Sequence, residues 1–440
     1  MATADAVVVG AGIAGVAAAH QLAVRRGVGR VVIVDPRPPL TLTSDKSTEC
    51  YRNWWPNIPM VGLMNRSIDL LEEFSEESGG AFGLSRRGYL FVTADLVRLA
   101  LMEAQADLIT TFGAGAVRRH PGPDPYGDYP DGVDILDSAE LRRHFPYLTP
   151  DAVGGVHVRR AGWFSAQQLG AWMLEESARH GATRIVDTVT SIQVPGDRVG
   201  GVSLAGGETI ESPIVVAAAG PFSAHVAALA GVELPLKSEL HLKVAFRDHL
   251  GVIPRDAPMV IWSDPQRIDW SDEEREGLAE MGRDDLLGDM PVFCHGRPEG
   301  GEESQWFLGL WEYHRHVYDD PVYPLPEDQL YPEAVIRGLA TMIPGLAAYR
   351  DHLPEARVDG GYYTKTVENR PLIGPAGPEG LYLVCGFSGF GVMVAAGAAD
   401  LLAAHIAGEP LPAYADAFLL SRYDDPAYME ELSRAESGQL

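Results

Sequence analysis

The chain has 440 residues, too many for one hydrophobic core and enough for two or three domains. Its formal net charge is −26, from 35 basic and 61 acidic residues, which opposes binding to nucleic acid and to anionic membrane surfaces. The three cysteines are scattered and fit neither a disulfide framework nor a zinc site, so we expect a cytoplasmic protein.

The first stretch of the chain has the spacing of a dinucleotide-binding site. Residues 6–9 are apolar without alternation, which is typical of a strand buried in a parallel sheet. Gly10, Gly12 and Gly15 follow at the G-x-G-x-x-G spacing, which allows a tight turn, close approach of a pyrophosphate and close packing of the next helix. We expect that helix at 14–24, with its N-terminal N–H groups directed at the phosphates.

Asp35 completes this pattern. It ends a second apolar strand, residues 31–34, and lies twenty residues beyond Gly15, where a carboxylate accepts hydrogen bonds from both ribose hydroxyls. Its charge would repel a 2′-phosphate, which disfavours NADP. By itself the stretch fits FAD and NAD equally.

The elements that follow alternate between helix and strand. Residues 36–59 form a long loop of polar and aromatic residues, and loops of that length are usually functional. Beyond it the sequence predicts, in order, a helix at 61–77, a strand at 88–92, a helix at 96–112, a loop at 121–132, a helix within 162–181 capped by Ser165, a strand at 183–194, a hairpin within 196–207 and an apolar strand at 214–219.

The pattern changes in the middle of the chain and returns to glycine-rich turns near its end. Strands of antiparallel type are predicted at 240–246, 259–262 and 306–311, with an acidic helix at 272–287. A strand at 381–385 then enters a glycine loop, and a helix of small residues leaves it. The apolar run at 392–407 is too short to span a bilayer, so we expect no membrane.

Five segments together resemble the FAD-dependent D-amino-acid oxidase (DAO) superfamily, closest in motifs to monomeric sarcosine oxidase and glycine oxidase-like flavoenzymes. They are the N-terminal fingerprint, GWFSAQQLGAWMLEESARHGA, VVAAAGPFS, NRPLIGP and GFSGFGVMVAAG. The resemblance implies an α/β fold with a Rossmann-type FAD-binding domain and an inserted antiparallel-sheet α+β substrate domain. The implied domains are 1–87, 151–232 and 358–440 for FAD, and 88–150 and 233–357 for the substrate.

The resemblance also implies where FAD binds. Besides the three fingerprint glycines and Asp35, the implied contacts are Ile13, Ala14, Lys46, Ser47, Thr48, Val189, Ala219, Gly220, Gly386, Phe387, Ser388, Gly389, Phe390, Gly391, Val392 and Met393. The helix beginning near Gly391 would place its positive end beside the flavin oxygen that gains charge on reduction. Gly361 stands where sarcosine oxidase attaches its flavin through cysteine, so we expect noncovalent FAD.

Arg52 is the first candidate for the substrate site, because the segment Thr48–Arg52 matches the loop whose last arginine binds the substrate carboxylate in sarcosine oxidase. An arginine tied to a loop carbonyl or to the cofactor is the equal alternative. The second carboxylate partner of the family, a lysine, falls on Met393, so half of that clamp is missing. With Trp54 and Trp55 nearby, this favours a substrate larger or more apolar than sarcosine.

Other catalytic candidates come from the middle and end of the chain. His314 and Tyr363 match residues of the sarcosine oxidase active site, although a structural histidine is the alternative for His314. The oxygen-activating lysine of that enzyme falls near Leu310. Lys365 or Lys243 is the candidate replacement for its charge, and a solvated surface position is the alternative for each.

These residues lead to one functional hypothesis and two rivals. The hypothesis is oxidation of an amine or amino acid to an imine by hydride transfer to flavin N5, with O2 reoxidising the flavin and giving H2O2. The first rival is a dehydrogenase of an amine or 2-hydroxy acid that uses another electron acceptor. The second is an FAD-binding protein with no small-molecule oxidation of its own. The sequence indicates no particular oligomeric state.

Overall fold

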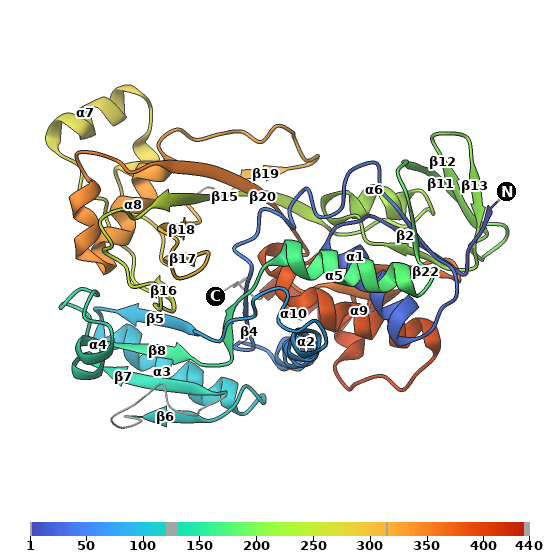
Figure 1. Cartoon of the computed structure of the whole chain (residues 1–440), viewed down its shortest axis with the longest axis horizontal. Coiled ribbons are helices and arrows are strands. Elements are labelled where there is room, and N and C mark those ends of the chain that lie inside the picture. Colours follow the sequence, from blue (N-terminus) through green and yellow to red (C-terminus); the bar gives the residue numbers. More distant parts are fainter. Residues whose placement is uncertain (1, 120–130, 314–315, 435–440) are drawn as a thin grey trace.

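Two large sheets organise the molecule, which is known from a computed structural model that describes residues 2–119, 131–313 and 316–434 (Figure 1). The first sheet has six strands, parallel except for β21, in the order β10 (Thr183–Ile185), β3 (Val31–Val34), β2 (Ala6–Val9), β14 (Val215–Ala217), β22 (Leu381–Cys385) and β21 (Leu372–Pro375). Segments from the start, middle and end of the chain therefore build one Rossmann-type unit.

Each face of the six-stranded sheet has its own core. Alternation of side chains sends Val8 and Ile33 to a face covered by helices, and Val7 and Val32 to the opposite face. The helices are α1 (Ile13–His20), α5 (Ala166–Arg179) and α9 (Gly391–Ala407). The opposite face packs on α6 (Ser223–Ala228) and on a small sheet of β1 (Ala2–Thr3), β13 (Thr209–Glu211), β12 (Gly201–Leu204) and β11 (Val189–Gln193).

The second large sheet has ten strands and is mixed rather than purely antiparallel. Its order is β19 (His316–Tyr318), β15 (Lys237–Arg247), β18 (Trp306–Leu310), β17 (Cys294–Glu299), β16 (Met259–Trp262), β5 (Tyr89–Thr93), β8 (Gly154–Val158), β7 (Val133–Asp137) and β6 (Val117–Arg119), with β20 (Ala356–Lys365) paired to β15. The predicted antiparallel strand 259–262 pairs antiparallel with β17 but parallel with β5. Helices α3 (Leu96–Thr110), α4 (Ser138–His144), α7 (Asp272–Glu280) and α8 (Tyr331–Met342) belong to this unit.

The fold class expected from the sequence is confirmed, and several local boundaries differ. The predicted strand 183–194 is two strands, β10 and β11, which lie in different sheets. The long loop 36–59 contains β4 (Cys50–Arg52), which pairs with β9 (Ala161–Trp163). The predicted helix 14–24 ends its α-helical part at His20 and continues as a π-helical turn, and most of the loop predicted at 121–132 lies outside the described residues.

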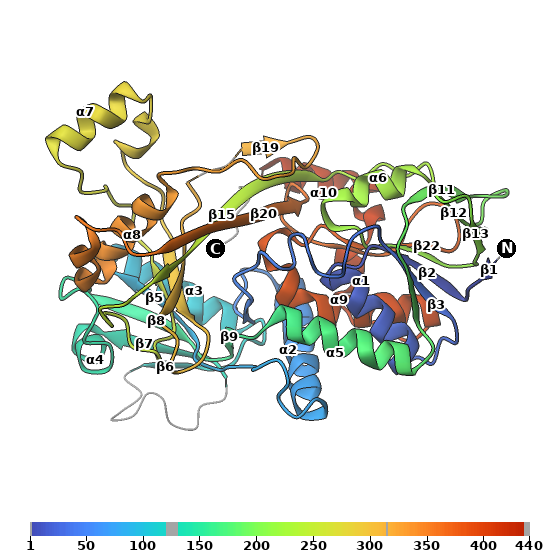
Figure 2. The same ribbon diagram turned by 45° about the horizontal axis from the view of Figure 1, so that its top comes forward.

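The domain boundaries predicted at 150 and 358 each divide the larger sheet. β8 begins after residue 150 and pairs with β5 and β7, while β20 extends to Lys365 along β15. Sequence spacing alone did not reveal the pairing of β8 with β5 or of β20 with β15, because these partners lie far apart in the chain. β15 and β20 run together from the larger sheet toward the Rossmann unit, as Figure 2 shows.

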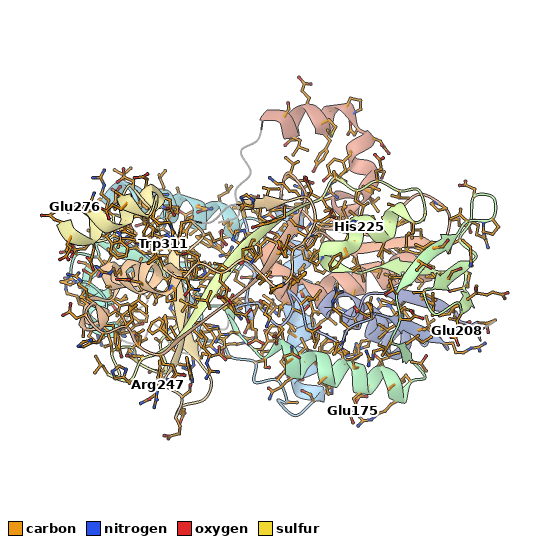
Figure 3. All side chains as sticks on the ribbon, turned by 90° about the horizontal axis from the view of Figure 1, so that it is seen from above. Glu175, Glu208, His225, Arg247, Glu276 and Trp311 are labelled. Carbon is orange, nitrogen blue, oxygen red and sulfur yellow. The ribbon has the colours of Figure 1, made fainter. Side chains whose placement is uncertain are left out.

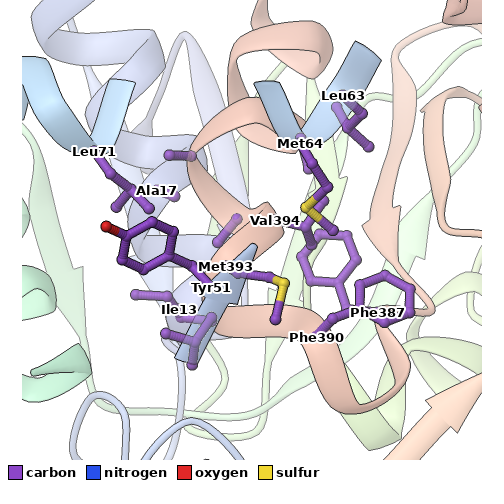
Figure 4. Close-up of a cluster of buried hydrophobic side chains, with 14 of the residues drawn as sticks. Ile13, Ala17, Tyr51, Leu63, Met64, Leu71, Phe387, Phe390, Met393 and Val394 are labelled. Carbon is purple, nitrogen blue, oxygen red and sulfur yellow. The ribbon is translucent and has the colours of Figure 1, made fainter. Parts of the chain in front are cut away.

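Helix α9 forms the centre of the largest core. It packs against α1 and against α2 (Ile58–Glu77), and Figure 4 shows side chains of all three helices converging there. Ser67 of α2 donates its hydroxyl hydrogen to the Met393 carbonyl at 2.5 Å, and its Oγ accepts from the Gly397 N–H at 3.1 Å. By length and apolarity, residues 388–407 are the one stretch within the described residues that could cross a membrane, yet 72% of its most apolar window is buried here.

The glycine turn brings α1 so close to β2 that a side chain at Gly15 would not fit between them. A Cβ at Gly15 would lie 2.0 Å from the Gly10 carbonyl oxygen, which is a rigid backbone atom. A Cβ at Gly12 would meet only the Ser44 hydroxyl, at 3.4 Å. The two glycines therefore have different roles, one in packing and one facing open space.

We predict that Gly15→Ala lowers the free energy of unfolding of the FAD-free protein by at least about 2 kcal/mol, because α1 must move away from β2. Gly12→Ala is the matched control and should leave it within about 0.5 kcal/mol of wild type. Urea unfolding of both FAD-free variants, followed by far-UV circular dichroism, measures the difference. Equal stability of the two variants would contradict this account.

Candidate functional site

A cavity of about 530 Å³ lies where the Rossmann unit meets the ribbon of β15 and β20. Its walls come from the glycine turn after β2, the ends of β3 and β14, the loop before β4, the loop between β22 and α9, and one face of the β15/β20 ribbon. Ligands in α/β sheets bind beyond the carboxyl ends of the strands, and this cavity has that position.

The glycine turn shapes one end of the cavity. Gly10 has φ +114°, and a Cβ there would lie 2.5 Å from the Ala218 carbonyl oxygen, so β2 and β14 approach closely. Asp35 accepts hydrogen bonds from the Ala11 and Arg37 backbone N–H groups, both at 2.8 Å. These bonds hold the Asp35 carboxylate at the wall of the cavity.

The loop between β22 and α9 shapes the opposite wall. Gly386 and Ser388 have φ values of +72° and +49°, which turn the chain back before α9 begins at Gly391. The Ser388 hydroxyl is buried at the cavity wall and has no hydrogen-bond partner among the described residues. An unpaired buried hydroxyl is costly unless a ligand satisfies it.

The residues of the cavity fit FAD. The bare Cα of Gly12 leaves space at the N-terminus of α1, Asp35 is placed for a ribose, and Ser388 offers an unpaired hydroxyl beside a helix N-terminus. FAD bound here would supply the two-electron acceptor of an oxidation.

Two lysines line the cavity, and their pKa values shift in opposite directions. Lys46 forms ion pairs with Asp45 at 2.7 Å and Asp359 at 2.9 Å; burial opposes its charge, but these two carboxylates outweigh burial and raise its pKa. Lys243, on β15, donates to the Ser47 carbonyl oxygen at 2.8 Å. Burial lowers the pKa of the Lys243 ammonium.

The β15/β20 ribbon presents a row of polar side chains. The His241 imidazole stacks on the Tyr363 ring with centroids 3.8 Å apart, and both residues line the cavity. Burial raises the pKa of the Tyr363 phenol, which stays neutral. The adjacent His241 imidazole and the Lys365 ammonium, 2.8 Å away, hold the pKa of the Glu239 carboxyl well below its usual range.

Most of the residues predicted to bind FAD line this cavity. They are Gly10, Gly12, Ile13, Ala14, Asp35, Lys46, Ser47, Thr48, Val189, Ala219, Gly220, Gly386, Phe387, Ser388, Gly389, Gly391 and Val392. Gly15, Phe390 and Met393 do not: Gly15 packs on the Gly10 carbonyl, and the other two are buried in the core shown in Figure 4. Their contact with the cofactor stays a prediction.

The fold places the catalytic candidates in different surroundings, and not all of them line the cavity. Tyr363 lines the cavity, whereas Lys365 does not and pairs with Glu239 instead. Arg52 is buried behind the wall, its guanidinium lying 4.9 Å from the centre of the Trp55 ring and 5.6 Å from that of Tyr89. His314 lies outside the described residues.

The tryptophans that favoured a large substrate are also core residues. Trp54 packs on Phe91 with ring centroids 5.1 Å apart, and Trp55 packs on Phe390 at 4.8 Å. Neither lines the cavity. A preference for larger substrates must therefore come from other residues.

Sequence reasoning missed two polar residues of the site. Ser44 accepts a hydrogen bond from the Ile13 backbone N–H at 3.0 Å, which pins the long loop over the glycine turn. His241 lies within the predicted strand 240–246 and was not recognised as a residue of the site. Its signal was the alternation of Lys237, Glu239, His241 and Lys243 at every second residue, which puts four titratable side chains on one face.

We predict that Gly12→Ala weakens FAD binding at least tenfold, because the added methyl group occupies the space that a pyrophosphate needs. Gly277→Ala is the matched control, since its Cβ would meet nothing within 4 Å on the remote helix α7. Quenching of flavin fluorescence on titration with FAD-free protein measures the dissociation constant. An unchanged constant for Gly12→Ala would contradict this placement of the pyrophosphate.

Comparisons with known proteins agree with this architecture. The model of the DAO family, described as FAD dependent oxidoreductase, matches residues 5–405. Mitochondrial sarcosine dehydrogenase of Mus musculus is 26% identical over 252 residues, which are 55% of this chain and 25% of that protein. Sarcosine oxidase subunit beta of Arthrobacter sp is 26% identical over 238 residues, which are 53% of this chain and 55% of that protein.

The aligned part thus spans a quarter of the first relative and about half of the second. Among solved structures, L-proline dehydrogenase from P.horikoshii has a TM-score of 0.74 at 21% identity, covering 98% of each chain. Glycine oxidase from Geobacillus kaustophilus has a TM-score of 0.74 at 17% identity, covering 96% of this chain and 99% of that one. At these identities the likeness shows the fold.

Proposed function

The chain belongs to the DAO family of FAD-dependent oxidoreductases, and on that basis we propose that it oxidises an amine or amino acid at its C–N bond to an imine. One observation carries the proposal: a single cavity has the dinucleotide turn at one end and a buried polar face of β15 and β20 at the other. The relatives named above, which act by name on sarcosine, proline and glycine, support an amino acid or amine as substrate.

When bound, FAD supplies the acceptor for the hydride that leaves the carbon next to nitrogen. The protein has to orient that C–H bond, exclude water and hold the amine unprotonated. Leu310, Tyr363 and Phe387 provide apolar surface in the cavity. This surface supports a substrate larger or more apolar than sarcosine.

The role of Arg52 and the cellular location remain predictions within this proposal. Arg52 is the candidate partner of a substrate carboxylate, although it lies behind the cavity wall in this structure. A cytoplasmic location is expected from cysteine usage alone.

We infer O2 as the electron acceptor because Lys243 places a cation in the cavity wall, which Leu310 also lines. A fixed positive charge stabilises the negative charge that develops on oxygen as it is reduced. The second candidate is a dehydrogenase that passes its electrons to another acceptor. It is favoured by the lowered pKa of Lys243, since a neutral amine would provide no such stabilisation.

We predict that an amine or amino acid bleaches the flavin absorbance of the anaerobic holoenzyme, whereas the 2-hydroxy acid of the same carbon skeleton does not. The panel should pair alanine with lactate, and add proline, sarcosine and larger N-methyl amino acids. Rapid recovery in air would support the oxidase. Slow recovery with fast turnover on a quinone would show the dehydrogenase, and bleaching by hydroxy acids alone would overturn amine oxidation.

We predict that Lys243→Met slows reoxidation of the reduced holoenzyme by air at least tenfold, because the variant loses the cation beside the reacting oxygen. Lys243→Arg is the control that keeps the charge and should stay within about threefold of wild type. Stopped-flow mixing of photoreduced protein with oxygenated buffer measures the rate, after the FAD content of each variant has been matched. Equal rates for Met and Arg would remove Lys243 from oxygen chemistry.

A further inference from the structure

One face of the β15/β20 ribbon carries titratable side chains from the cavity to the surface. Strand alternation places Lys237, Glu239 and His241 on the same face of β15. The antiparallel register sets Lys365 opposite Lys237, Tyr363 opposite Glu239 and Gly361 opposite His241. These six positions therefore form two facing rows, of which the inner end lines the cavity.

The exposure of these side chains rises steadily along the row. The relative exposure is 3% for His241, 9% for Glu239, 16% for Lys365 and 46% for Lys237. His241 Nε2 lies 3.5 Å from Glu239 Oε2, which in turn lies 2.8 Å from Lys365 Nζ. Lys237 Nζ is 3.4 Å from Glu239 Oε1. The carboxylate thus connects a buried imidazole to an exposed ammonium group.

His241 is set up to take a proton from the cavity. Neither ring nitrogen makes a hydrogen bond to a described residue, although the side chain is almost wholly buried. The Glu239 carboxylate faces Nε2 and favours the tautomer with hydrogen there, which leaves a lone pair on Nδ1. Nδ1 lies 3.8 Å from Glu312 Oε1, so a carboxylate that attracts cations stands beside that lone pair.

We propose that His241 is a catalytic base which accepts a proton from the substrate ammonium, and that Glu239 and the two lysines pass a proton on to solvent. This inference rests on the proposed function, since amines enter mostly as ammonium ions at neutral pH. The ammonium N–H bond breaks and its proton joins Nδ1, which leaves a neutral amine and an imidazolium. Nε2 then releases its proton to Glu239, and a lysine ammonium releases one of its own protons to solvent and takes the proton from Glu239 in exchange.

The neutral amine can then undergo the oxidation proposed above. The carbon next to nitrogen loses a hydride, that is, one proton and two electrons, and the nitrogen lone pair forms the C=N bond. Bound FAD would supply the acceptor for these two electrons. Each turnover thus releases one proton from the ammonium group inside a buried site, which is the proton that the row carries.

The proposal makes the reaction depend on pH in a defined direction. The imidazole must be neutral to accept the proton, so reduction of the flavin should become faster as pH rises. The charged and titratable groups around the imidazole are Glu239 and Lys243 on β15, Tyr363 and Lys365 on β20, and Glu312 after β18.

The test compares anaerobic flavin reduction by the fastest amine of the panel in wild type, His241→Asn and Glu239→Gln holoenzymes from pH 6 to pH 10. At pH 7 we expect a loss of about 10²-fold for His241→Asn and about tenfold for Glu239→Gln. Both rates should approach that of wild type as pH rises toward the pKa of the free amine, because a growing share of the substrate then arrives without the extra proton. Glu239→Asp should recover most of the loss.

Arg247→Gln is the control on the same strand. Arg247 lies at the far end of β15, donates to Gln305 at 2.8 Å and is exposed, as Figure 3 illustrates. It should match wild type at every pH. FAD content and the melting temperature of each holoenzyme separate a folding defect from a kinetic one.

The possible failures are distinguishable. A uniform loss in His241→Asn across the whole pH range would overturn the base role, and a wild-type rate in Glu239→Gln would overturn the relay, while amine oxidation itself would stand. If no amine reduces the wild-type flavin, the proposed function fails and this inference fails with it.

Discussion

The close approach of backbone at the glycine turn is the constraint on which the rest of the site depends. Gly15 packs directly on the Gly10 carbonyl, and Gly10 packs on the end of β14. Because of these two contacts, α1 begins at the wall of the cavity and the three ends of β2, β3 and β14 meet there. Steric exclusion of Cβ atoms, together with the hydrogen bonds of Asp35 and Ser44 to this turn, determines where the dinucleotide end lies.

The β15/β20 ribbon connects this turn to the second sheet. Its register is unbroken over ten residue pairs, from Lys237 opposite Lys365 to Phe246 opposite Ala356. His241 and Lys243 on one face of β15 line the cavity, while Leu240 and Leu242 on the other face belong to the core of the larger unit. The alternation that buries those apolar side chains on one face of β15 places the polar side chains in a row on the other face. The same strand therefore contributes both to the core and to the site.

Electrostatics differ between the two ends of the cavity. The glycine-turn end has the N-terminus of α1, which suits the phosphates of a dinucleotide. The ribbon end has lysines, carboxylates and an imidazole, most of them paired with each other. These paired groups can gain and lose protons, so the ribbon end is suited to moving protons. The glycine-turn end has a helix N-terminus instead and is suited only to binding a negative charge.

Local patterns in the sequence determined the Rossmann unit. The spacing of Gly10, Gly12 and Gly15, the acid at Asp35 and the two glycine loops are short-range features, because each depends on a turn and its neighbouring helix. Tertiary structure decided the catalytic wall. Lys243 and His241 face the cavity, while Lys365 and Arg52 do not, because that choice depends on the register between strands more than a hundred residues apart. No local spacing contains that register.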